Sequence, residues 1–175
     1  MSKISFYQTC FQSSNSEKID FEDYLNGIRD GKWQDSVLNY RSGKIKKEKN
    51  PAITASGFFE NQRQATQLTE HSGFLCIDID SKDNPDINVL EKRAELGCDP
   101  FIYAFHVSVG GFGLALYFKI KKNKHLESFL AIEKYLADNY KIVSDPSCKD
   151  VSRLRFVSYD PELYFNQKAK IKFIS

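Results

Sequence analysis

One short segment, residues 74–80 (FLCIDID), constrains the fold and chemistry of this chain more than any other. Its apolar run predicts a buried strand. Asp78 and Asp80 are two residues apart, so their side chains point to the same face of that strand. Two neighbouring carboxylates repel each other unless a cation lies between them. The segment therefore predicts a site for Mg²⁺ or Mn²⁺ and phosphoryl-transfer chemistry. The alternative is that both acids only begin the polar loop at 81–86.

The composition is that of a folded globular chain. Its 175 residues are 41% hydrophobic and 14% aromatic, which predicts one domain over 1–175, with N-terminal elements at 1–50 and a motif-bearing core at 51–175. The net charge of +2 neither requires nor excludes a nucleic-acid partner. No apolar run approaches the ~20 residues of a membrane span, and the N-terminus lacks the apolar core of a signal peptide. We therefore expect a cytoplasmic protein with no membrane partner.

Hydrophobic periodicity and turn residues predict an α+β fold. The central order of strand, helix, hairpin, helix and strand is that of a ferredoxin-like or RRM-like βαββαβ sheet, here with additional N-terminal elements. The basic run 41–49 is predicted to be an exposed, mobile connection. The expected strands are 4–10, 51–59 (strand or turn), 74–80, 101–107, 114–120, 153–158 and 169–174, and the expected helices are 21–28, 87–96 and 125–140.

Two further segments could bind phosphate. The hairpin turn 108–113 (SVGGFG) contains three glycines that allow backbone N–H groups to approach an anion, and its first residue could add a hydroxyl. The alternative is that these glycines only make a tight turn. Arg153 and Arg155 would share one face of a strand, which suits phosphate recognition. Alternatively, they belong to a salt-bridged sheet face, with Asp145 or Asp150 as partners.

The cysteines and histidines do not form a recognisable ligand or catalytic set. The three histidines, His71, His106 and His125, have no metal-ligand spacing, although His106 could face the site from the strand before the glycine turn. The four cysteines contain no C-x-x-C pair, which predicts reduced, mostly buried thiols and neither a disulfide framework nor a zinc site. They are Cys10, Cys76, Cys98 and Cys148.

Four segments together resemble the VirE N-terminal domain family. They are 51–58 (PAITASGF), 71–80 (HSGFLCIDID), 108–114 (SVGGFGL) and 145–161, which contains DVSRLRFVSYDP. That family occurs in replication proteins of bacterial mobile elements and phages, and it is grouped with the primase-polymerase branch of the archaeo-eukaryotic primases. The resemblance covers roughly residues 45–166.

The resemblance implies an RRM-like core of the primase-polymerase type and a possible nucleotidyltransferase activity. The implied catalytic residues are Asp78, Asp80 and Asp145. The implied metal ligands, for Mg²⁺ or Mn²⁺, are Asp78, Asp80, Asp145 and Asp150, the last as an alternative to Asp145. The implied nucleotide-binding residues are Ser108, Gly110, Gly111, Gly113, Arg153 and Arg155. The implied partners are nucleoside triphosphates, single-stranded DNA or RNA, and a helicase-type module.

The chain departs from this family in two respects that bear on activity. Active members carry a histidine just after the glycine turn, where this chain has 114–117 (LALY), and Phe112 replaces a basic residue. One alternative is therefore a catalytically degenerate domain that only binds single-stranded nucleic acid, stacking bases on Phe101, Tyr103 and Phe105. Another is a structural module without metal.

Overall fold

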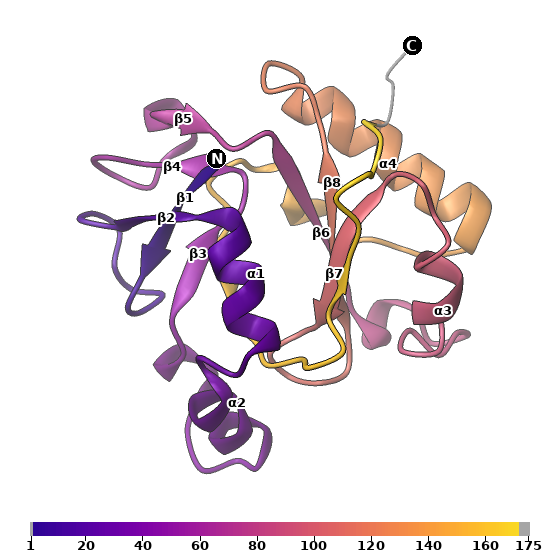
Figure 1. Ribbon diagram of the computed structural model, residues 1–175, viewed down its shortest axis with the longest axis horizontal. Coiled ribbons are helices and arrows are strands. Elements are labelled where there is room, and N and C mark those ends of the chain that lie inside the picture. The colour runs from indigo at the N-terminus through magenta and orange to yellow at the C-terminus, as the bar shows by residue number, and fades with distance from the viewer. Residues whose placement is uncertain (1, 172–175) are drawn as a thin grey trace.

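The computed structural model describes residues 2–171 and shows an α+β fold, as the sequence predicts (Figure 1). Its main elements are two four-stranded antiparallel sheets, with strand orders β2-β1-β3-β9 and β10-β7-β8-β6. The first contains β2 Glu17–Asp20, β1 Lys3–Tyr7, β3 Ala52–Thr54 and β9 Arg155–Phe156. The second contains β10 Tyr164–Phe165, β7 Ile102–Val107, β8 Leu114–Lys119 and β6 Phe74–Ile79. A small third sheet pairs β4 Gly57–Phe58 with β5 Glu70–His71.

Helices cover the sheets. They are α1 Phe21–Arg29, α2 Gln34–Arg41, α3 Arg93–Leu96 and α4 His125–Tyr140, with short 3₁₀ turns η1 Lys47–Lys49, η2 Ala65–Gln67, η3 Ser81–Asp83 and η4 Pro146–Lys149. Within the described residues, none of these helices combines the length and the apolar character that a membrane crossing requires.

The second sheet is buried on both faces, and the side chains of β6 point alternately to these two faces, as predicted. Leu75, Ile77 and Ile79 belong to the apolar cluster that α4 completes. Phe74 and Cys76 point the other way, into the cluster shared with α1 and the first sheet. Asp78 points to the same side as Phe74 and Cys76, since alternate residues of a strand share a face. The strand therefore directs the Asp78 carboxylate into the layer between the two sheets.

The predicted aromatic stacking surface on β7 is wrong. A bulge shifts the β7–β8 register between Ile102 and Ala104, so neighbouring aromatic residues do not share one face. Tyr103 packs in the cluster with α1, whereas Phe105 packs in the cluster with α4. Both side chains are 3% exposed. A nucleic-acid base cannot stack on either ring without displacing the core.

Other local predictions need correction. The helix expected at 87–96 is reduced to α3, although it ends at Gly97 as predicted. Of the strand expected at 153–158, only the two residues of β9 form a strand. Of the strand expected at 169–174, residues 169–171 are not a strand, and 172–174 lie outside the described residues. The basic run 41–49 is not simply a connection, because Arg41 ends α2 and Lys47–Lys49 form η1.

Candidate functional site

A cavity of about 370 Å³ lies where the end of β6, the turn 108–113 and the segment 145–156 meet. Most of the side chains that the sequence singled out line this one cavity. They are Asp78, Asp80, Ser108, Gly110, Gly113, Asp145, Arg153 and Arg155. Gly111 and Asp150 are not among the lining residues. Carboxylates and guanidinium groups thus come together from segments that are far apart in the sequence.

Asp78 and Arg155 form the innermost ion pair of the cavity. Arg155 Nη1 donates to Asp78 Oδ1, and only 7% of the Arg155 side chain is exposed. The guanidinium also lies 5.9 Å from the ring centre of Tyr117. Burial alone would lower the pKa of Arg155, but the charge of Asp78 raises it well above its usual value. Arg155 therefore remains a buried cation, and its Nε has no hydrogen-bond partner among the described residues.

Asp145 is the second carboxylate of the cavity. Its Oδ1 caps η4 by accepting from the Ser147 N–H (2.8 Å), and its Oδ2 accepts from Arg153 Nη2 (3.1 Å). The Asp145 N–H donates to the Asp78 carbonyl oxygen at 3.0 Å, which fixes η4 against the end of β6. Burial would raise the pKa of Asp145, but the hydrogen bonds from Ser147 and the charges of the arginines lower it. Asp145 is thus an anion that faces Asp78.

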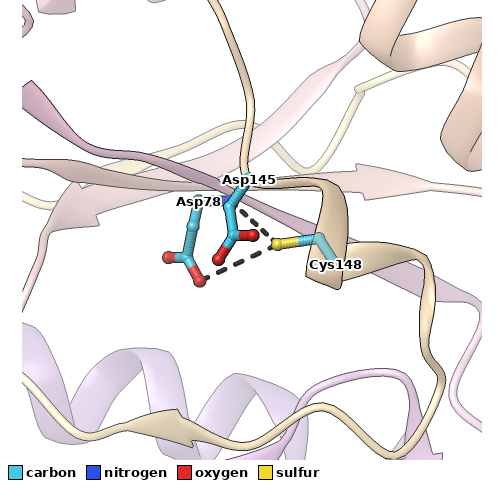
Figure 2. Close-up of side chains that lie close together, drawn as sticks. All are labelled: Asp78, Asp145 and Cys148. Carbon is cyan, nitrogen blue, oxygen red and sulfur yellow. Dashed lines mark hydrogen bonds between the residues drawn. The ribbon is translucent and has the colours of Figure 1, made fainter. Parts of the chain in front are cut away.

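Cys148 joins these two carboxylates, and the sequence analysis did not identify it as a ligand. Asp78, Asp145 and Cys148 each offer one potential ligand atom, and these atoms lie within 4.8 Å of one another. Figure 2 shows the three side chains close together. The Cys148 sulfur accepts from the Asp78 N–H at 3.3 Å and lies 3.8 Å from Asp78 Oδ2. The structure thus brings Asp78 and Asp145 together, as predicted, and adds a sulfur.

Asp80 and Asp150 are not part of this cluster. Asp80 lines the cavity, but its side chain is 45% exposed and lies 3.8 Å from the Lys82 ammonium group. Asp150 accepts hydrogen bonds from the backbone and hydroxyl groups of Ser152 at 2.9 Å, so it shapes its own loop. Of the two acids considered as the third metal ligand, Asp145 therefore shares a possible cation site with Asp78, and Asp150 does not.

The glycines of the 108–113 turn have different structural roles. Gly111 has a positive φ of 87°, which favours glycine. A Cβ at Gly113 would lie 2.5 Å from the Ile79 carbonyl oxygen, so the close approach of the turn to β6 requires glycine there. A Cβ at Gly110 would meet nothing within 4 Å. The geometry of the turn therefore requires glycine at 111 and 113. At 110 there is room for a side chain, so steric constraints do not explain why this residue is glycine.

Arg41 supports this turn from behind. Its Nε donates to the Val109 carbonyl and its Nη2 to the Ser108 carbonyl, each at 3.1 Å. Both carbonyl groups are thus bound by a side chain that does not line the cavity. The N–H groups of Gly110 and Phe112 have no hydrogen-bond partner within the described chain. The basic run thus begins with a structural residue that the sequence analysis assigned to a mobile connection.

His106 has the satisfied structural role that the sequence left open. Its Nδ1 donates to the Val107 carbonyl (2.8 Å), so its Nε2 accepts from the Tyr117 hydroxyl (2.9 Å). Tyr117 in turn lies 3.2 Å from the Tyr24 hydroxyl. Burial lowers the pKa of His106 to about 4, so it is neutral near pH 7. These hydrogen bonds link three buried side chains, one of which, Tyr117, contacts the Arg155 guanidinium.

Together, the fold and the cavity define an α+β domain with paired carboxylates and guanidinium groups between two antiparallel sheets. Residues 44–165 match the family described as "BT4734-like, N-terminal domain", and the chain belongs to that family. This match includes every residue that lines the cavity except Cys10 and Tyr40. No curated protein and no solved structure matches the chain.

The family match corrects the resemblance on which part of the sequence analysis rested. The chain matches the BT4734-like N-terminal domains over the segment that we compared with VirE N-terminal domains. The assignment to mobile-element replication proteins, primases and nucleotidyltransferases was therefore wrong. The helicase-type partner depended on the same assignment and has no other support.

Proposed function

We propose that the cavity binds a nucleoside triphosphate together with a divalent cation. The observation that carries this proposal is the convergence of Asp78 and Asp145 with Arg153 and Arg155 at one cavity. Carboxylate oxygens are the ligands that Mg²⁺ and Mn²⁺ prefer. Guanidinium groups are suited to phosphate oxygens because their N–H donors form a planar fork. A cation–phosphate pair would be complementary to both sets at once.

The charges of the cavity favour this ligand over a simple anion. Each carboxylate is already paired with one arginine, so the four groups together are close to neutral. A divalent cation at the carboxylates would make the cavity positive, and a polyphosphate would then balance it. The free N–H groups of Gly110 and Phe112 would supply additional donors.

Single-stranded nucleic acid is the second ligand of this proposal. Lys44, Lys46, Lys47 and Lys49 are all exposed, and Lys47 also lines the cavity. Lysines attract a phosphate backbone without reading its sequence. Because the aromatic residues of β7 are buried, this interaction would be electrostatic rather than based on base stacking. We also propose that the β6–β8 core is RRM-like. The proposed location of the protein is the cytoplasm.

Calorimetric titration with ATP tests the proposed nucleotide site. The titration is made with Mg²⁺, with Mn²⁺ and with excess EDTA. We expect affinity to depend on the cation. Replacing Arg153 with alanine should weaken binding roughly 10- to 100-fold, the value of a charged hydrogen bond. The Arg153 side chain is 46% exposed, so this change should leave the fold intact. Lys134→Ala on α4 is the control. Equal affinity in EDTA and in Mn²⁺ would contradict the proposal.

A further inference from the structure

The cluster of Asp78, Asp145 and Cys148 differs in one respect from an oxygen-only site. Asp78 and Asp145 line the cavity, whereas Cys148 lies on their far side, 2% exposed, at the edge of the apolar cluster beneath α4. A cation between them would therefore have oxygen ligands toward the cavity and sulfur toward the core. Figure 2 shows the sulfur facing the two carboxylates.

The spacing of the Cys148 sulfur and the Asp78 carboxylate is close to that of two ligands of a small tetrahedral ion. Zinc bonds of about 2.3 Å to sulfur and about 2.0 to 2.2 Å to oxygen place two tetrahedral ligands about 3.5 Å apart. Cys148 Sγ lies 3.8 Å from Asp78 Oδ2. The oxygen that faces the sulfur is not the one that Arg155 occupies, since Arg155 contacts Oδ1. Asp78 can therefore hold a cation and keep its ion pair with Arg155.

We propose that Cys148 is a ligand of the cation at Asp78 and Asp145, and that this site selects a zinc-class ion over Mg²⁺. The inference rests on the proposed function for the two carboxylates and narrows the class of cation. Thiolate sulfur favours borderline-soft ions such as Zn²⁺ and Co²⁺, whereas Mg²⁺ favours an all-oxygen set. Three protein ligands leave a fourth position open, as in catalytic zinc sites. That position would face the cavity, where a phosphate oxygen or water could occupy it.

Binding involves the loss of one proton. The Cys148 thiol exchanges its S–H bond for an S–metal bond, and the proton leaves to solvent. Without a cation, burial and the charge of Asp78 raise the pKa of this thiol to about 12, so it is protonated. A dipositive ion close to the sulfur offsets both effects, as it does for coordinating thiols in general. The sequence predicts no zinc site because Cys148 is a single cysteine that lacks the C-x-x-C pattern of such sites.

Cobalt binding tests this inference, because a thiolate ligand gives Co²⁺ an intense charge-transfer absorption in the near ultraviolet. The full chain is titrated with Co²⁺ in a phosphine reductant that does not compete for the ion. We expect one equivalent to produce the charge-transfer band and Zn²⁺ to displace it. Cys148→Ser should abolish the band. Cys76→Ser should retain it, since Cys76 is also buried and near Asp78 but lies outside the cluster.

A second measurement does not depend on how the variants fold. X-ray absorption of the zinc-loaded wild-type chain should show one sulfur at about 2.3 Å among lighter ligands. Cobalt or zinc bound without sulfur would overturn the role of Cys148 but leave the proposed carboxylate site intact. A charge-transfer band that persists in Cys148→Ser would likewise overturn it. If neither these ions nor Mn²⁺ bind, the proposed function fails as well.

Discussion

Asp78 and Arg155 form an ion pair that joins the two four-stranded sheets, because one lies on β6 and the other on β9. An apolar cluster that is rich in aromatic residues also packs between these two sheets. The same pair forms one wall of the cavity. The contact between the two sheets is therefore also part of the proposed binding site.

We expect Arg155→Met to destabilise the fold by about 3 to 5 kcal/mol, because it leaves the Asp78 carboxylate without its buried partner. Arg153→Met removes the corresponding pair with Asp145, whose arginine is 46% exposed. That change should cost no more than about 1 kcal/mol. Urea unfolding of both variants measures the difference. Similar losses in the two variants would show that the Asp78–Arg155 pair has no special structural role.

The glycine turn allows a test of local packing. Gly113→Ala should cost roughly 1 to 3 kcal/mol, since its Cβ would lie 2.5 Å from the Ile79 carbonyl oxygen. Gly110→Ala places its Cβ in open space and should change stability by less than about 0.5 kcal/mol. Thermal unfolding of the two variants side by side compares them. A larger loss at Gly110 than at Gly113 would mean that the turn is packed differently.

Stability should fall in mild acid because of His106. Its pKa is about 4 in the folded chain and 6.5 in the reference state. Between these values the unfolded chain binds more protons, so the stabilising contribution is complete above about pH 6.5 and is lost as the pH falls toward 4. The full effect is on the order of 3 kcal/mol.

Urea unfolding at about pH 7 and about pH 5 measures this dependence. His106→Gln should lose less stability than the wild-type chain between the two conditions. Some dependence should persist, because burial also lowers the pKa of His71 to about 4. An unchanged pH dependence in His106→Gln would indicate that other groups are responsible.

Single-stranded DNA should bind weakly and more weakly still as salt rises. Neutralising the four exposed lysines of the basic run should lower the slope of log K against log salt by up to about 3. They are Lys44, Lys46, Lys47 and Lys49. The control chain carries the same change at four exposed lysines in and beside α4: Lys121, Lys122, Lys134 and Lys141. Equal slopes for all three chains would exclude this segment from the nucleic-acid interface.

The parts of the fold that the sequence predicts well have strong local patterns. The apolar run of β6, the glycine hairpin and the helical stripe of α4 each need only neighbouring residues to be recognised. The structure confirms all three elements. By contrast, α2 buries only Val37 and so lacks an apolar stripe, while β10 has only two residues. Such elements form because the surrounding structure supports them, and their own sequences contain no strong pattern that would predict them.

The candidate site could be predicted in part for the same reason. Asp78 is recognisable because it lies near the end of a buried strand. Cys148 becomes its neighbour only when η4 docks against β6 through the Asp145 N–H. Similarly, no local pattern predicts that Arg41 holds the glycine turn. Contacts between residues distant in the sequence depend on the completed topology, which residue spacing alone does not determine.

A crystal structure of the chain with Mn²⁺ and a non-hydrolysable nucleoside triphosphate would show whether the cavity binds both ligands together. Anomalous scattering locates manganese independently of the other atoms. We predict a peak about 2 Å from oxygens of both Asp78 and Asp145, with the triphosphate against Arg153 and the 108–113 turn. A nucleotide bound elsewhere, or a cavity that contains neither ligand at saturating concentrations, would contradict the account.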